Sequence, residues 1–507
     1  MHDRNVKVIG ISGSLRNARF GRGSDKFIEE IKKINNFNNL QSYLKKQTKI
    51  RAQDYFTAGE REGKPFDQIY RVLQKAKGDK GLSNSEASLA AGLWGACNEG
   101  VDIGHVGLSI YFPMSGKSKN LIKLKKKIID ADALLISGPV YFGDRGSPIH
   151  EFIEFLSSDP ELREHFRGKV YAGISVGAKR NGGQETNLIY QIIDMSNLNM
   201  LTLGNSSSTT SQYGGTVVAG DIGSAWSDEY GLDTAIGTGE RIANVAKALA
   251  NIKSFELKGK LRVGVWVMQD TKDKTGLEYL QKIITEANRN DVEFDIIDVT
   301  EEKVARCIAC DLCPTHHAPR DEYACIIGTK DDFFVKDHAR LVNTDAILMM
   351  SYSPIDRSKL NSVYQRFIER TRYIRRANYG FSELLAAPFV ISEINANQNL
   401  HIRMLTSLVR HHTILHHPVI AYKHENEIIN YEYRMKQFNV FLDSAIKTTC
   451  ARLLRESSEI DTEYNPLGYI ISKERNKTDK DTGKMNKILE RDRILYVSER
   501  NTRLKRI

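Results

Sequence analysis

Long apolar runs are missing from this sequence of 507 residues, and no apolar stretch approaches the roughly 18 residues that a membrane-spanning helix needs. The first residues, MHDRNVKVIGISGS, lead straight into a strand pattern, without the basic and then apolar regions of a signal peptide. With 41% hydrophobic and 27% charged residues, the composition is typical of a soluble globular protein. We therefore expect a cytoplasmic protein with no membrane partner.

Cysteine is also scarce, since the chain has only 6, too few to staple a protein of this size with disulfides. Four of them nevertheless fall within residues 307–325, in the run CIACDLCP and at one later position. In a reducing compartment, thiols spaced this closely indicate metal or redox chemistry.

Acidic residues are outnumbered, and the net charge of +10 favours acidic partners, nucleic acid among them. From Lys473 to the end, however, 12 Lys and Arg residues stand against 6 Asp and Glu residues, so the tail holds over half of the excess. We interpret residues 456–507 as a basic C-terminal extension, a flexible arm that docks on another subunit of a homo-oligomer. Nucleic acid is not the partner we expect.

Two parts of the chain carry the same order of apolar runs. Residues 6–12 and 260–268 are rich in Val and Ile, and residues 130–143 and 343–354 are apolar runs bounded by turn residues. Apolar runs that do not alternate are typical of strands buried in a parallel sheet, and helical patterns follow them here. The pattern predicts two doubly wound α/β domains in tandem, with a boundary near residues 254–260.

A candidate anion loop, GISGSLR at residues 10–16, follows the first predicted strand. Helix N–H groups and small hydroxyls can surround a phosphate, although an ordinary turn has the same composition. The next helix start comes only at LSNSEASL, where we expect Asn84 or Ser85 to be the N-cap. Residues 17–82 are therefore interpreted as an insertion in this loop, forming a lid, part of a dimer interface or surface decoration.

Several separate motifs carry a family resemblance. GISGSLR joined to SNSEASL, followed by SGPVYFGDRGSPIHEFIE, VGAKRNGGQET and YGGTVVAGD, resembles the NAD(P)H-dependent FMN reductases and their iron–sulfur flavoprotein relatives. The resemblance implies two tandem flavodoxin-like doubly wound parallel sheets with helices on both faces, an FMN cofactor and NAD(P)H as co-substrate. The residues that it implies for FMN are Ser12, Ser14, Arg16, Asn84 and Ser85 at the phosphate, Pro139, Val140, Tyr141, Phe142 and Gly143 along the ring, and Gly182, Gly183, Gln184 and Glu185 on its other side.

No Ser/His/Asp or Cys/His arrangement has a recognisable hydrolase context, so we expect the cofactors to perform the chemistry. Proton donors near the flavin are named only by their neighbourhood, and the candidates are Tyr141, Tyr213 and His150.

The second domain resembles a copy of the first that has lost its flavin contacts. Where the first has SGSLR, the second has MQDTKDKTG, with Asp270 and Asp273 where a phosphate would be repelled. The segments SPIDRSK and EINANQN replace the other two flavin loops. We expect no FMN in this domain.

The cysteine spacing C-x2-C-x2-C-x11-C is formed by Cys307, Cys310, Cys313 and Cys325. Three thiolates two residues apart can surround one corner of a [4Fe–4S] cluster, with the fourth arriving from a later turn. Zinc, with His316 or His317 completing a mixed site, and thiols without a metal are the alternatives. In the iron–sulfur flavoproteins a cysteine quartet lies at this point and is followed by two aspartates, as Asp331 and Asp332 are here, although the last gap is longer than the family implies.

Two further segments invite binding hypotheses. Five histidines in LVRHHTILHHPVIAYKH are interpreted as a helix surface near a domain contact, some of them protonating below neutral pH, and metal binding is the weaker alternative. The arginines of RFIERTRYIRRANYG would bind an anionic substrate or nucleic acid, or would form a charged helix end facing the partner domain.

These features together predict a flavin-dependent oxidoreductase that passes electrons between NAD(P)H or a protein donor, FMN and a [4Fe–4S] cluster, reducing a small substrate or a protein acceptor. The alternative is a non-catalytic redox or zinc-stabilised binding module with an acidic or nucleic-acid partner. The predicted domains are a flavodoxin-like FMN domain at 1–257, a degenerate flavodoxin-like domain with the cysteines at 258–455, and the C-terminal extension.

Overall fold

A computed structural model of the chain divides into two compact units, Met1–Ala250 and Asn251–Ile507. The structure describes residues 5–15, 22–59, 81–205, 213–252, 256–269, 274–310, 323, 325–355, 360–376, 380–396, 399–425, 427–456 and 506. Within these residues, no helix combines the length and the apolar character that crossing a membrane requires.

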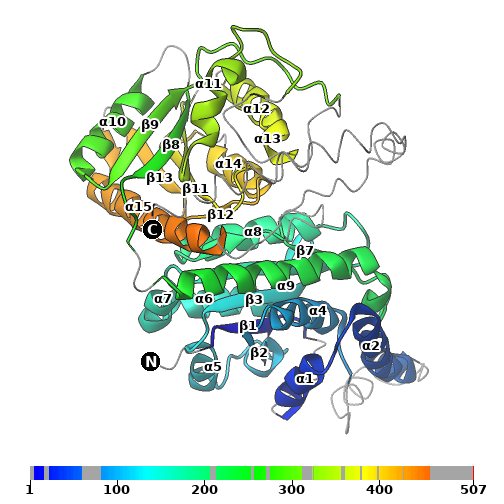
Figure 1. Ribbon diagram of the computed structural model, residues 1–507. Helices are drawn as coiled ribbons and strands as arrows, with labels where there is room; N and C mark the ends of the chain where they lie inside the picture. Colours follow the sequence, from blue (N-terminus) through cyan, green and yellow to red (C-terminus); the bar gives the residue numbers. More distant parts are fainter. Residues whose placement is uncertain are drawn as a thin grey trace. The chain divides into compact units, whose positions relative to one another are not determined.

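The first unit is a mostly parallel sheet in the order β2-β1-β3-β5, with β6 and β7 sharing the last position beside β5 (Figure 1). This is the 2-1-3-4-5 order of flavodoxin-like folds, so the predicted α/β fold class is confirmed. The strands are β1 Lys7–Ser12, β2 Asp102–Gly107, β3 Ala133–Tyr141, β4 Asp144–Arg145, β5 Val170–Gly177, β6 Leu201–Leu203 and β7 Gly215–Val218.

Helices cover both faces of this sheet. On one face, α4 and α9 pack so closely that a Cβ on Gly239 would lie 1.7 Å from the Gly92 carbonyl oxygen. On the other face, Ile149 of α6 contacts Gly13 and Gly138, and Leu188 of α8 contacts β5. The helices are α1 Arg22–Lys32, α2 Phe37–Gly59, α4 Asn84–Asn98, α5 Leu121–Ile128, α6 Ser147–Ser158, α7 Pro160–Phe166, α8 Gln184–Asn197 and α9 Glu229–Ala250.

The insertion contributes to the core of the first unit. Phe27 of α1 and Leu44 of α2 are fully buried, and the Phe27 ring meets the His105 ring of β2 edge-on at 4.8 Å. Helix α1 therefore covers β2 beside α4, and surface decoration is the wrong interpretation for this part of the insertion. Residues 60–80 of the insertion lie outside the described residues.

The second unit has the equivalent order β9-β8-β10-β11, with β12 and β13 sharing the last position beside β11. Its strands are β8 Leu261–Met268, β9 Val292–Asp298, β10 Ala346–Ser353, β11 Leu385–Glu393, β12 Ile414–Leu415, β13 Val419–His424 and β14 Glu427–Ile429. Both sheets thus have the same strand order and the same divided last strand, whereas descent by duplication stays a prediction.

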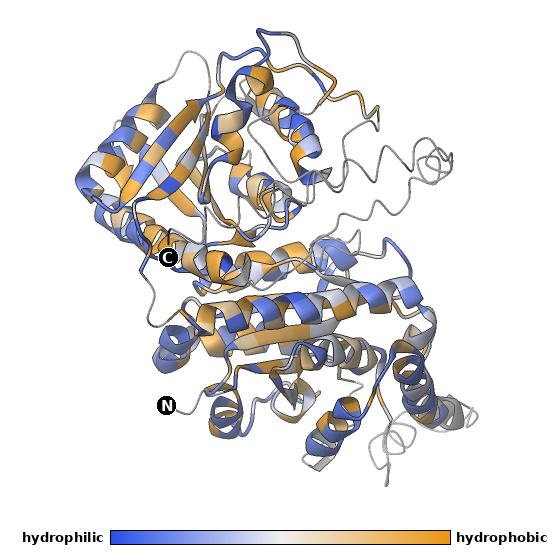
Figure 2. Ribbon diagram, in the orientation of Figure 1, coloured by the Kyte–Doolittle hydropathy of each residue, from blue (hydrophilic) through white to orange (hydrophobic). Residues whose placement is uncertain are grey.

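Aromatic side chains fill the core of the second unit on both faces of its sheet. Trp266 packs against Phe367 of α12 on one face, and Phe389 packs between Tyr279 of α10 and Phe438 of α15 on the other. Figure 2 shows hydrophobic strands lying between helices whose outer sides are hydrophilic. The helices are α10 Thr275–Ala287, α11 Phe333–Val342, α12 Leu360–Arg370, α13 Arg372–Arg376, α14 Leu400–Val409 and α15 Tyr431–Glu456.

An aspartate precedes the third strand of each sheet and joins it to the first strand. In the first unit, Asp132 Oδ2 accepts a hydrogen bond from Lys7 N at 3.0 Å, and Asp132 Oδ1 pairs with Lys169 Nζ at 2.9 Å. In the second unit, Asp345 Oδ2 accepts the corresponding bond from Arg262 N at 2.9 Å. An equivalent aspartate therefore joins the first strand to the third strand in each unit.

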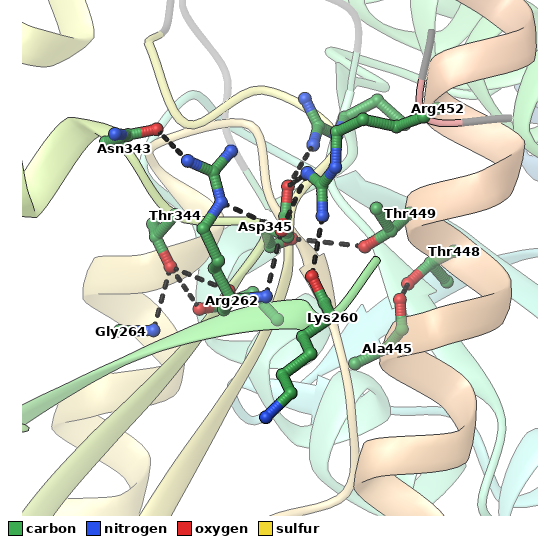
Figure 3. Close-up of polar contacts among 12 residues, drawn as sticks. Lys260, Arg262, Gly264, Asn343, Thr344, Asp345, Ala445, Thr448, Thr449 and Arg452 are labelled. Atoms are coloured by element: carbon green, nitrogen blue, oxygen red, sulfur yellow. Dashed lines mark hydrogen bonds and ion pairs between the residues drawn. The ribbon is translucent and has the colours of Figure 1, made fainter. Parts of the chain in front are cut away.

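Asp345 also forms ion pairs with arginines from the C-terminal part of the chain (Figure 3). Arg452 Nη2 of α15 lies 3.4 Å from Asp345 Oδ1, and Arg506 Nη1 lies 2.9 Å and 3.0 Å from the two carboxylate oxygens. The Asp345 side chain is only 2% exposed. Burial by itself would raise the pKa of Asp345, but the two arginines outweigh burial and leave that pKa below its usual value.

Replacing Asp345 by Asn should lower the free energy of unfolding by about 3–5 kcal/mol, because it leaves the buried guanidinium of Arg452 without its counterion. A group whose pKa is lower in the folded protein stabilises it above its unfolded pKa, here 3.8, and ceases to do so as the pH falls through the folded value. Urea unfolding, followed by circular dichroism from pH 7 to pH 3, should thus show a steeper acid loss for the wild type than for Asp345→Asn.

The matched control is Asp443→Asn, on the same helix as Arg452. Its side chain is 68% exposed and pairs with Arg289 at 2.7 Å. An exposed ion pair contributes about 0–1 kcal/mol, so equal losses in the two variants would contradict a special role for Asp345.

Candidate functional site

The candidate anion loop and the start of α4 meet at the end of β3. Gly13 N donates to the Ser137 carbonyl oxygen at 2.8 Å, and Ser137 Oγ donates to the Ser85 carbonyl oxygen at 2.9 Å. One serine of β3 thus links two segments that the insertion separates in the sequence. The arrangement brings Ser14 and Ser85 to the carboxyl end of β1, where α/β sheets bind ligands.

The N-cap of α4 is one residue earlier than expected. Ser83 accepts from Glu86 N at 3.2 Å, and the Glu86 side chain accepts from Ser83 N at 3.1 Å, which forms a capping box. Asn84 instead holds a neighbouring segment: its Nδ2 donates to the Asp221 carbonyl oxygen at 3.0 Å, and its Oδ1 accepts from Ala225 N at 3.2 Å. The expected cap at Asn84 or Ser85 is therefore wrong, although both residues begin the helix.

Ser12 belongs to a buried polar chain that sequence reasoning missed. Ser12 Oγ lies 3.2 Å from His105 Nε2, and His105 Nδ1 lies 3.2 Å from Ser24 Oγ on α1. All three side chains are buried. The end of β1 is therefore connected to the insertion through His105, while Arg16 lies outside the described residues.

A strained hairpin follows β3 and presents two aromatic side chains. Val140 pairs with Arg145 and Tyr141 with Asp144, so the turn has two residues, Phe142 with φ 52° and Gly143 with φ 80°. Positive φ at both positions indicates a type I′ turn, which is unusual for phenylalanine. The Phe142 side chain is fully exposed and that of Tyr141 is 55% exposed, although residues of this kind are normally buried.

The glycine loop before α8 packs directly on this hairpin. Gly183 has φ 96°, and a Cβ at this position would lie 3.0 Å from Gly143 Cα and 3.1 Å from Val140 Cγ1. Gln184 is buried and donates from Nε2 to the Lys179 carbonyl oxygen at 2.8 Å, whereas Glu185 is exposed on the first turn of α8. The structure thus brings together residues 139–143 and 182–185, two sets that lie far apart in the sequence.

A buried arginine, also missed by sequence reasoning, fastens the hairpin to α8. Arg145 is 7% exposed, and its guanidinium lies 3.2 Å from Asp144 Oδ1 and also pairs with Asp194. Burial raises the pKa of Asp194, and the charge of Arg145 opposes that rise. The sequence feature that could have indicated this contact is the Asp-Arg dipeptide directly after the turn.

The three candidate proton donors lie in different places. Tyr141 is on the hairpin, and His150 Nε2 lies 3.4 Å from Asp144 Oδ2 of the same hairpin. Tyr213 comes just before β7, which begins opposite Ile174 in the middle of β5. The structure therefore places Tyr141 and His150 at the hairpin. The strand register of β7 does not place Tyr213 there.

In the second unit, the chain's own side chains take up the corresponding positions. Gln269 follows β8, is buried, and accepts a hydrogen bond through Oε1 from Leu277 N in the first turn of α10 at 3.2 Å. At the end of β11, Glu393 Oε2 accepts from Ile355 N at 2.8 Å, which places a negative charge beside the loop after β10. These contacts give a physical reason for the prediction that this unit binds no FMN, while Asp270 and Asp273 lie outside the described residues.

The cysteine segment precedes α11. Cys307, Cys310 and Cys325 are free thiols of intermediate exposure, and Ala309, between the first two, has φ 51°. Cys313, His316 and His317 lie outside the described residues, and among those that are described no three His, Cys, Asp or Glu side chains form a group that could hold a metal. The ligand set therefore stays a prediction.

The two aspartates after the cysteines differ in their surroundings. Asp331 is exposed, and hydrogen bonds from Lys303 and Thr329 lower its pKa to about 2. Asp332 is fully buried: its Oδ1 accepts from Phe334 N at 3.0 Å as the N-cap of α11, and its Oδ2 accepts from Ala305 N at 2.8 Å. Asp332 thus fixes the chain two residues before Cys307.

The histidine-rich segment is not a helix surface, which corrects that expectation. His411 and His412 lie in a turn after α14, His416 follows β12, and all three are buried. Burial lowers the pKa of His411 to about 3 and that of His416 to about 4, so both are neutral near pH 7.

Comparison with known proteins identifies relatives of part of the chain. Residues 84–214 match the family model described as NADPH-dependent FMN reductase. The matched region begins at the first residue of α4. An iron–sulfur flavoprotein of Methanocaldococcus jannaschii is 33% identical over 127 residues, 25% of this chain and 65% of that protein. An iron–sulfur flavoprotein of Archaeoglobus fulgidus is 28% identical over 138 residues, 26% of this chain and 69% of that protein.

A quinone-type NAD(P)H dehydrogenase of Solidesulfovibrio magneticus is 29% identical over 135 residues, 24% of this chain and 66% of that protein. Among solved structures, a WrbA-like flavodoxin from Agrobacterium tumefaciens matches with 15% identity and a TM-score of 0.26, covering 48% of this chain and 98% of the other. The match to the first relative, from Methanocaldococcus, spans less than two thirds of its length. Through residues of its first unit, the chain is therefore similar to the NADPH-dependent FMN reductases and to the iron–sulfur flavoproteins.

Proposed function

We propose that the chain is an FMN-dependent oxidoreductase that uses NAD(P)H or a protein electron donor to reduce a small molecule or a redox partner protein. The observation that supports this most directly is the contact of the Phe142–Gly143 hairpin with Gly183 at the carboxyl edge of the first sheet. The names of the relatives, iron–sulfur flavoprotein and quinone-type NAD(P)H dehydrogenase, point in the same direction.

The residues present fit FMN. The hairpin offers exposed aromatic surface at Tyr141 and Phe142, Gly143 faces open space, and the missing Cβ of Gly183 lets the glycine loop pack against the hairpin. The first turn of α4 supplies backbone N–H groups and the positive end of a helix dipole, which favours a phosphate. Ser14 and Ser85 supply hydroxyls at that point.

Bound FMN would supply hydride and single-electron transfer, and the protein's part is to bind, orient and exclude water. The Phe142–Gly143 turn would hold the ring against the glycine loop, with Arg145 fixing the turn through its buried ion pairs. His150, within 3.4 Å of Asp144 Oδ2, is the side chain beside the hairpin best suited to hold a proton. Tyr141 is the second candidate.

For the second unit we propose an iron–sulfur cluster held by Cys307, Cys310, Cys313 and Cys325. The three described thiols are free, partly exposed and carry soft sulfur donors, which suits iron–sulfur chemistry. The left-handed backbone at Ala309 resembles the strained turns that cluster at functional sites. Such a cluster would supply single-electron transfer.

Anaerobic purification with FMN, iron, sulfide and zinc counted per chain tests the whole proposal. We expect about one FMN and about four iron and four sulfide per chain, as a [4Fe–4S] cluster requires. A colourless protein that carries zinc would contradict it and support a zinc-stabilised binding module. Two FMN per chain would contradict the expectation for the second unit.

Gly183→Ala should weaken FMN binding by about tenfold or more, which corresponds to ~1.4 kcal/mol. The added Cβ meets Gly143 Cα at 3.0 Å, and φ 96° is unfavourable for alanine, so the hairpin must move away from the glycine loop. Fluorescence titration of the apoprotein with FMN measures the affinity.

The matched control for this variant is Gly168→Ala, before β5. Gly168 has a similar φ of 68°, but a Cβ there would meet nothing within 4 Å. The control should lose a comparable amount of stability and bind FMN as the wild type does. Equal FMN affinities for wild type and Gly183→Ala would rule out this loop as a flavin contact.

Cys310→Ser should lower iron and sulfide per chain by about half or more and leave FMN unchanged, because it removes a thiolate from the predicted ligand set. The control is Cys97→Ser in the first unit, a partly exposed thiol at the end of α4. Iron counts that do not differ between the two variants would remove Cys310 from the ligand set.

A further inference from the structure

Arg370, the last residue of α12, has a buried guanidinium that points at a cysteine. Its side chain is 1% exposed, and Nη1 donates to Cys325 Sγ across 3.6 Å. Nη2 donates to the Ile327 carbonyl oxygen at 2.6 Å and to the Tyr323 hydroxyl. The guanidinium therefore holds three consecutive parts of the Cys325 segment, although 45 residues separate it from Cys325 in the chain.

The surroundings of Arg370 strengthen the interactions of its charge with neighbouring groups. Its guanidinium carbon lies 5.5 Å from the centre of the Phe334 ring and 5.9 Å from that of Tyr323, and both rings exclude water. Asp332, with a fully buried carboxylate, lies 3.5 Å from Nη2. In surroundings of low polarity, a charge and its hydrogen bonds interact more strongly than they would at the surface.

The ion pair of Arg370 with Asp332 also involves the chain just before the cysteine segment. Asp332 Oδ2 accepts from Ala305 N at 2.8 Å, two residues before Cys307. Arg370 binds the Cys325 side directly and, through Asp332, is linked to the Cys307 side. One buried cation thus fixes described residues on both sides of the cysteine segment, at Ala305 through Asp332 and at Cys325 directly.

We propose that Arg370 is a positioning residue that raises the reduction potential of the proposed iron–sulfur centre through its hydrogen bond to the ligand Cys325. Reduction adds one electron to the centre, so the reduced form carries one more negative charge on its sulfurs. An N–H donated to a ligand sulfur stabilises that form more than the oxidised one, and the Asp332 carboxylate keeps the guanidinium in place to donate it. This inference depends on the proposed iron–sulfur centre and adds the residue that tunes it.

The sulfur contact separates this role from a purely structural one. A buried ion pair is weak evidence for stability, because apolar residues of similar volume often replace such a pair without loss. The bonds to Ile327 and Asp332 could serve folding alone, whereas the bond to Cys325 Sγ acts on the atom that would bind iron.

The test uses the full chain, purified anaerobically, as wild type, Arg370→Gln, Arg370→Lys and the control Arg366→Gln. Arg366 lies one turn earlier on α12 and is only partly buried. Iron and sulfide per chain are measured first, and the midpoint potential of the centre is then measured by electron paramagnetic resonance during redox titration. We expect Arg370→Gln to lower the equilibrium constant for reduction about tenfold, equivalent to 59 mV for one electron.

Arg370→Lys keeps a charge but cannot reach the sulfur, Ile327 and Asp332 with one planar group, so its shift should be smaller and of the same sign. Arg366→Gln should keep the wild-type potential. A wild-type potential in an iron-loaded Arg370→Gln protein would overturn the inference and leave the proposed function intact. If both Arg370 variants lose iron, the residue holds the site together and does not tune it, and a wild type without iron would overturn the centre itself.

Discussion

The parallel pairing of the first strand with the third is the contact on which each unit depends. It brings the loop after the first strand beside the end of the third, as Gly13 N and the Ser137 carbonyl oxygen show at 2.8 Å. The crossovers on the two sides of this pair leave in opposite directions, and open α/β sheets bind ligands at the carboxyl edge of such a point. The position of the candidate FMN site follows from this pairing and not from any single loop.

The second unit keeps the same strand pairing and uses it differently. In register the counterpart of Ser137 is Met350, which has no hydroxyl, and the next residue, Ser351, donates from Oγ to the Met268 carbonyl oxygen at 2.7 Å, within the sheet. In the first turn of α10, Leu277 N donates a hydrogen bond to the side-chain Oε1 of Gln269. Each unit thus satisfies a first-turn N–H with a side chain of its own, Ser83 at α4 and Gln269 at α10, so the strands stay alike while the loops differ in their residues.

The central strands could be predicted from the sequence because helices cover both faces of each sheet, which makes β1, β3, β5, β8, β10 and β11 largely buried apolar runs. The N-cap of α4 was misplaced because Ser83, Asn84 and Ser85 are all good caps, and only backbone geometry distinguishes them. The hairpin was missed because Phe142 adopts a φ that its side chain disfavours, which tertiary contacts alone can enforce. His105 and Arg370 act on residues 93 and 45 positions away, and local periodicity carries no information about contacts of that range.

The two buried ionic clusters of the second unit lie at opposite ends of β10 in sequence and differ in what they can explain. Asp345, before β10, binds Arg262, Arg452 and Arg506, so it joins the first strand, the last helix and the C-terminal end of the chain. All its partners are structural, and its role is complete without a ligand. Arg370, after β10 and α12, contacts a carboxylate, a hydroxyl and a carbonyl, and its Nη1 also donates to sulfur. Since apolar packing could replace the first three partners, the bond to Cys325 is the feature that requires a guanidinium at this position.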